Sequence, residues 1–219
     1  MKTRKFLLIF ISLYTIFFLG RGLQLLGINW LIYPVYFLLF ILGILAYREE
    51  LKEQLALILT KKKEFLKTIS LYMVFVFLLS IACNFLSAFI KYSLDLPLQG
   101  QNDANIQGAL LKNPFLITVF GSFIGPFVEE FFFRRFFLGT FLAKFSNWLG
   151  IVLTTILFAT LHMHSWSLSE WVTAISYIAG GLLYSLLYLR KDKNIWYPIA
   201  LHCCNNIIAF VMTIFSISQ

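Results

Sequence analysis

The chain has 219 residues, of which 60% are hydrophobic and 13% are charged, with a mean hydropathy of +0.82. Soluble domains are about 45–50% apolar and about 25% charged, so this composition excludes an ordinary soluble protein and indicates an integral membrane protein. The net charge of +8 is typical of basic cytoplasmic loops. Because the sequence has no glycine-rich phosphate loop and no basic-aromatic surface, we expect no nucleic-acid partner.

Apolar stretches long enough to be read as membrane-spanning helices occur seven times. The first resembles a secretory signal but lacks a small-residue cleavage site, so we interpret it as an uncleaved span. The sequence therefore predicts an all-α, polytopic transmembrane helix bundle of about seven spans. The predicted spans are residues 6–20, 28–47, 68–90, 114–133, 148–163, 171–189 and 195–217.

The basic residues between these spans fall mostly on one side of the membrane, which predicts a cytoplasmic N-terminus. With that orientation, the outer segments carry three basic residues, Arg21, Lys91 and Lys112. The inner segments carry the other fifteen: Lys2, Arg4, Lys5, Arg48, Lys52, Lys61, Lys62, Lys63, Lys67, Arg134, Arg135, Lys144, Arg190, Lys191 and Lys193.

Two connections between the predicted spans are long. Residues 48–67 fit a helix lying on the inner leaflet, with Lys61–Lys63 at the anionic headgroups, although a solvated loop is the alternative. Residues 91–113 are polar and predict an irregular outer loop. The apolar face of the first connection would consist of Leu51, Leu55, Ile58 and Leu59.

Few residues inside the apolar segments can carry chemistry, and a charge at bilayer depth costs roughly 2.5–3.5 kcal/mol on insertion scales. Glu129 and Glu130 lie in the fourth span, and His162 ends the fifth. The seventh contains His202, Asn205 and Asn206.

Helical spacing separates the roles of the two glutamates. Glu130 and Arg134 are four residues apart with the acid first, which is the favourable order for an ion pair. Glu129 has no such partner, so it is the candidate general base. His202 and Asn206 also share a helical face. A hairpin centred near residues 145–146 places Glu129 and His162 at similar depth.

Each feature also has a structural interpretation. The charges could mark the cytoplasmic end of a span, and the histidines and asparagines could form interfacial or interhelical hydrogen bonds. Their joint occurrence at matching depths favours a shared site.

The three motifs together resemble those of the CPBP family of CAAX proteases and bacteriocin-processing enzymes, also called the Abi family of intramembrane proteases. The resemblance covers roughly residues 114–210. It implies N-terminal transmembrane helices over residues 1–113 and a catalytic helical core over 114–219. The motifs are Glu129-Glu130-x-x-x-Arg134, Phe158-x-x-x-His162 and His202-x-x-x-Asn206.

The resemblance implies an endopeptidase of the cell membrane that acts on a membrane-associated, prenylated or leader peptide. Glu129 would activate the water, His162 and His202 would position it, and Asn206 would help to stabilise the oxyanion. Glu130, Arg134, Phe158 and Asn205 would support the site. A zinc ion is an open alternative: Glu129, His162 and His202 would be its ligands and Glu130 the base.

Two other functions compete with a protease. A non-catalytic bacteriocin-immunity or scaffold protein would use the same cavity for binding and would tolerate loss of the glutamate. A proton- or ion-coupled transporter would use Glu129 as the carrier, but the sequence has no internal repeat and no interrupted pair of helices. In both alternatives the protein still lies in the lipid bilayer.

Overall fold

The computed structural model describes residues 2–217, which form helices joined by turns and short loops and contain no strand. This result confirms the predicted all-α polytopic bundle. The elements in chain order are α1 (Lys2–Tyr14), η1 (Thr15–Leu19), α2 (Gly22–Leu25), η2 (Asn29–Leu31), α3 (Ile32–Thr60), α4 (Lys62–Ser93), α5 (Gln101–Lys112), α6 (Pro114–Val119), η3 (Phe120–Ile124), α7 (Gly125–Glu130), η4 (Phe131–Phe141), α8 (Asn147–Leu161), α9 (Leu168–Arg190) and α10 (Trp196–Ile217).

Side-chain caps explain where several helices begin. Asn113 accepts a hydrogen bond from the Leu116 amide, and a proline opens α6 directly after it. Ser146 and Ser167 cap α8 and α9 in the same way. From α6 to η4 the chain is one continuous helix, which widens into π-helical turns at η3 and η4.

Within residues 2–217, five helices are long and apolar enough to cross a membrane: Asn29–Thr60, Lys62–Ser93, Pro114–Phe141, Leu168–Arg190 and Trp196–Ser216. The predicted first and fifth spans are also helical, over α1–η1 and α8, but α8 has only 15 residues. The span count of seven and the inward-facing N-terminus therefore stay predictions.

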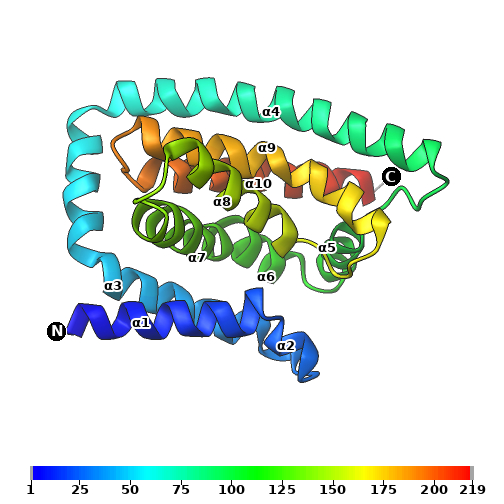
Figure 1. The fold of residues 1–219 in the computed structure, drawn as a ribbon, viewed down its shortest axis with the longest axis horizontal. Helices are drawn as coiled ribbons and strands as arrows, with labels where there is room; N and C mark the ends of the chain where they lie inside the picture. The colour runs from blue at the N-terminus through cyan, green and yellow to red at the C-terminus, as the bar shows by residue number, and fades with distance from the viewer. Residues whose placement is uncertain (1, 218–219) are drawn as a thin grey trace.

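The long helices lie roughly side by side in layers (Figure 1). α1 packs along the first part of α3 at one side, and α4 runs along α9 at the other. The helix from α6 to η4, together with α8, α9 and α10, fills the middle. α4 exposes a row of phenylalanines, including Phe77, Phe85 and Phe89, as a lipid-facing helix must.

The predicted interfacial helix is the second half of α3 rather than a separate element. It turns across one end of the bundle, in cyan at the left of Figure 1, and ends at Thr60. The expected apolar face is divided: Leu51 and Ile58 are buried against the bundle, whereas Leu55 and Leu59 are exposed.

The prediction of an irregular loop over residues 91–113 was wrong. α4 continues to Ser93, and α5 occupies Gln101–Lys112. This helix is polar, and tertiary contacts with α9 hold it in place. The Gln101 amide donates to Glu170 Oε1 at 3.2 Å, and Asn102 Nδ2 donates to the Tyr177 hydroxyl at 2.8 Å.

Candidate functional site

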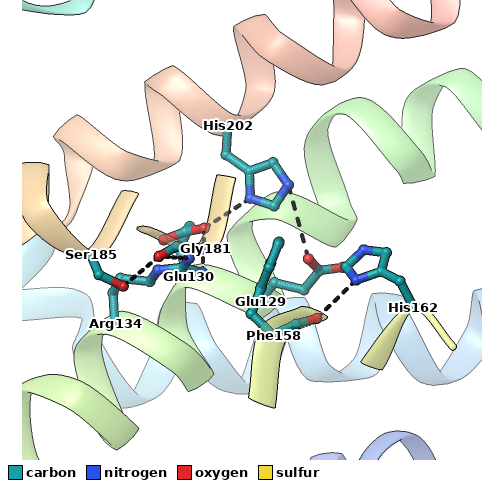
Figure 2. A network of polar contacts seen from close by, with 8 residues as sticks. All are labelled: Glu129, Glu130, Arg134, Phe158, His162, Gly181, Ser185 and His202. Atoms are coloured by element: carbon teal, nitrogen blue, oxygen red, sulfur yellow. Dashed lines mark hydrogen bonds and ion pairs between the residues drawn. The ribbon is translucent and has the colours of Figure 1, made fainter. Parts of the chain in front are cut away.

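Three helices bring most of the predicted residues together in the middle of the bundle. Figure 2 shows the two glutamates from α7, His162 from the end of α8 and His202 from α10 around a common centre. Glu130 is fully buried, and Glu129 and His202 are 9% and 4% exposed.

Glu130 and Arg134 form the ion pair that their spacing predicts. Arg134 Nη1 donates to Glu130 Oε1 at 3.0 Å, and both side chains are 0% exposed. Arg134 Nη2 also donates to the carbonyl of Gly181 on α9 at 3.3 Å. A buried charge is tolerated only when it is paired and hydrogen-bonded, and this guanidinium has both kinds of partner.

His202 lies between the two carboxylates. Its Nδ1 is 2.8 Å from Glu130 Oε1, and its Nε2 is 3.9 Å from Glu129 Oε2. An ionised carboxylate can only accept, so Nδ1 carries a proton and donates to Glu130. The sequence predicted that Glu129 faces this histidine; it did not predict that Glu130 makes the closer contact.

One oxygen of the Glu129 carboxylate accepts no hydrogen bond from the described residues. Its Oε2 is buried and has no hydrogen-bond partner among residues 2–217. No described lysine or arginine side chain lies within 4.0 Å of it. The 3.9 Å separation from His202 is too long for a direct hydrogen bond, so the histidine does not satisfy this oxygen.

His162 follows the last residue of α8, with its ring held in a defined orientation. Nδ1 donates to the Phe158 carbonyl at 2.9 Å, because a carbonyl oxygen can only accept. Nε2 is therefore left for a ligand. The Phe158 ring contacts both histidines, with centroid separations of 4.9 Å to His162 and 5.8 Å to His202.

The two asparagines of α10 have separate neighbours. Asn206 Nδ2 donates to the Gly121 carbonyl of η3 at 2.8 Å, so one of its two amide hydrogens is used. Asn205 lies beside the Tyr184 hydroxyl. Asn206 thus faces η3, and no hydrogen bond between it and His202 is present among the described residues.

The donor set does not fit a zinc ion held by three side chains. Within residues 2–217, no three His, Cys, Asp or Glu side chains converge closely enough to hold a metal. A tetrahedral zinc site needs its ligand atoms at about 2.0–2.3 Å from the ion. We therefore derive no chemical step through a metal.

The sequence analysis missed three residues on one face of α9. Tyr177 stacks on His162 with ring centroids 4.1 Å apart, and Tyr184 stacks on His202 at 4.7 Å. The Gly181 carbonyl lies between them in the sequence and receives Arg134. Positions 177, 181 and 184 follow the i, i+4, i+7 pattern of one helical face, which is the signal that could have identified them.

Comparison with known proteins places similarity in the segment that carries these residues. The sequence profile of the family described as type II CAAX prenyl endopeptidase Rce1-like matches residues 111–208. A protein of Bacillus subtilis (strain 168) named "Putative membrane peptidase YdiL" is 26% identical over 114 residues, which cover 52% of this chain and 43% of that protein. The match thus spans less than half the length of the relative. No solved structure matches the chain.

The fold is that of an integral membrane protein, with a cluster of buried polar side chains inside its helix bundle. The two sequence matches confirm the resemblance to the CPBP family and support a membrane protease of the CAAX type.

Proposed function

We propose that this chain is an intramembrane endopeptidase in which Glu129 activates the water that attacks a peptide bond. One observation carries the proposal: the free acceptor Oε2 of Glu129 faces Nε2 of His202 at 3.9 Å inside the bundle. A buried carboxylate that faces an oriented imidazole is the arrangement that water activation requires. The matched family supports the reaction class.

In the proposed reaction, one water is bound between Glu129 Oε2 and His202 Nε2. Its oxygen attacks the carbonyl carbon while Glu129 accepts one proton. The C–N bond then breaks, and Glu129 returns that proton to the leaving amine nitrogen. The second amide hydrogen of Asn206 is a candidate donor to the oxyanion.

Both histidines act as orienting groups in this scheme. The Nδ1 of His202 is held by Glu130, and that of His162 by the Phe158 carbonyl. Each ring thus presents Nε2 to the reacting centre. The Glu130–Arg134 pair fixes His202 from behind, so its role is positional.

We propose a membrane-associated substrate, with a prenylated CAAX peptide as the first class to test and leader peptides as the second. The name of the matched family supports this choice. We further propose that residues 114–219 form the catalytic core and residues 1–113 the helices around it. The similarity to a Bacillus protein supports a bacterial cell membrane as the location.

The test is cleavage of a fluorogenic farnesylated peptide ending in a CAAX sequence by protein purified in detergent. We expect wild type and Glu53→Gln to cleave it, because Glu53 is an exposed glutamate of α3. Glu129→Gln should lose more than about 1000-fold in kcat, since the amide cannot accept the proton. Equal cleavage by Glu129→Gln and Glu53→Gln would contradict Glu129 as the base, whereas absence of cleavage by wild type would favour a binding protein that uses the same site.

A further inference from the structure

The ring of His162 is held more tightly than its position in the sequence suggests. It follows the end of α8, where side chains are commonly mobile. Its Nδ1 nevertheless donates to Phe158 at 2.9 Å, and its face stacks on Tyr177 with an interplanar angle of 17°. The hydrogen bond fixes one ring atom, and the stacked tyrosine fixes the plane. Together they set the direction of Nε2.

Tyr177 is in turn held by α5. Its hydroxyl accepts a hydrogen bond from Asn102 Nδ2 at 2.8 Å and donates one to Asp103 Oδ1 at 3.0 Å. Both partners lie in the first turn of α5. They precede residues 111–208, so the matched family segment does not contain them.

The same turn of α5 is joined to the loop that carries His162. Glu170 is 5% exposed and accepts from two amides, that of Gln101 at 3.2 Å and that of His164 at 2.9 Å. The ring of His164 also contacts Asn102 Oδ1 at 3.2 Å. Burial lowers the pKa of His164. A neutral His164 ring then donates from Nε2 to Asn102.

Close approach of α5 to α9 depends on a glycine. A Cβ added at Gly100 would lie 2.4 Å from Thr173 Cγ2, so a larger residue would force either the start of α5 or the Thr173 side chain to move. Gly108, on the same helix, has nothing within 4 Å of such an atom. The two glycines form a matched pair for testing whether α5 must be docked.

We propose that α5 is a positioning cap for the site: its first turn clamps Tyr177, and Tyr177 fixes the imidazole plane of His162. Tyr177 is thus a positioning residue that acts through His162. Its effect on cleavage rests on the function proposed above, whereas its effect on the His162 ring does not.

The first arm of the test measures kcat and KM on the fluorogenic farnesylated peptide. Tyr177→Leu removes the stacking ring and should lower kcat about tenfold, with KM changed less than about twofold. Gly100→Ala and Tyr177→Phe keep an aromatic ring at position 177 but weaken the contacts of α5 with it. We therefore expect each to lower kcat about threefold. Gly108→Ala and Tyr92→Leu are the controls, because Tyr92 is 82% exposed. They should match wild type.

The second arm follows the histidine rings directly and does not depend on cleavage. The chain has three histidines, so nitrogen-15 labelling gives three imidazole spin systems, assigned through single His→Gln variants. Wild type should show His162 as one tautomer protonated at Nδ1. In Tyr177→Leu and Gly100→Ala that signal should broaden or shift toward mixed tautomers, while the His202 signal stays unchanged.

Unchanged His162 signals in both variants would overturn the proposal, whether or not the peptide is cleaved. Altered signals would support it even if wild type cleaves no peptide, and only the proposed function would then fail. The proposal would also fail if Tyr177→Leu and Gly100→Ala had the same kcat as the control variants Gly108→Ala and Tyr92→Leu. A higher kcat in Tyr177→Phe than in Tyr177→Leu would show that the effect comes from the aromatic ring and not from a general loss of stability.

Discussion

At the scale of single residues, the four charges of Pro126–Phe137 divide into three units. Arg134 neutralises Glu130 inside the bundle at 3.0 Å. Arg135 reaches Glu50 of α3, with Nε 2.7 Å from the carboxylate, so it is not a simple headgroup contact. Glu129 forms no ion pair with a lysine or arginine among the described residues, and its Oε2 has no hydrogen-bond partner there. The spacing predicted the first unit, but the partner of Arg135 lies 85 residues away and leaves no local signal.

The buried ion pair should be costly to break from one side. Replacing Arg134 with Gln leaves the Glu130 carboxylate buried beside His202, which should lower the free energy of unfolding by about 3 kcal/mol. Arg48→Gln is the control, since its pair with Glu49 is more than 60% exposed on both sides, and surface pairs contribute about 0–1 kcal/mol.

Thermal unfolding of both variants in the same detergent measures this difference. An Arg134→Gln protein as stable as Arg48→Gln would mean that the buried pair contributes no more than an exposed one. It would also remove the argument that Glu130 is a structural brace.

At the scale of helices, the second half of α3 holds the turn that starts α10. Gln54 Oε1 accepts from the Ile195 amide at 2.8 Å, and Trp196 Nε1 donates to the Leu51 carbonyl at 2.9 Å. Because α10 carries His202, this docking helps to set the register of the site.

Gln54→Ala should therefore destabilise the bundle although Gln54 is only half-buried. We expect a loss of about 1–2 kcal/mol, since a net hydrogen bond contributes about 1 kcal/mol and the buried Ile195 amide loses its acceptor. Gln99→Ala, which removes one exposed bond to Gln107, is the control and should change stability little. Denaturation in mixed micelles compares the two, and equal stabilities would refute the role of Gln54.

One helix, α5, was missed for a physical reason. Hydropathy identifies segments that lie in lipid, so it found the core of every long helix. It did not find α5, because this polar helix is held by Glu170 and Tyr177 of α9. The second span was predicted to end at residue 47 and an interfacial helix to occupy residues 48–67; in the structure α3 continues unbroken to Thr60.

At the scale of the whole molecule, the site exists only through the packing of separate helices. Motif spacing correctly grouped Glu129, Glu130, His162 and His202 on three neighbouring segments. It could not give the relative rotation of α10 and α7, which decides that His202 contacts Glu130 more closely than Glu129. For the same reason, the shared helical face of positions 177, 181 and 184 could not show that Tyr177 lies against His162.

The packing also bears on metal dependence. Because no three donor side chains converge within residues 2–217, we expect peptide cleavage to survive dialysis against EDTA, with kcat within about twofold of untreated protein. A loss restored by added zinc would contradict this expectation. It would indicate that the donor atoms rearrange around an ion in the working enzyme.

The most direct test of the account compares Glu129→Gln with Glu130→Gln in peptide cleavage and thermal unfolding. If Glu129 is the base and Glu130 the brace, Glu129→Gln loses more than about 1000-fold in kcat at an unchanged melting temperature, whereas Glu130→Gln lowers both the rate and the melting temperature. The contrary result is a Glu129→Gln protein that cleaves at the wild-type rate beside a fully stable Glu130→Gln protein that does not cleave. That result would make Glu130 the base.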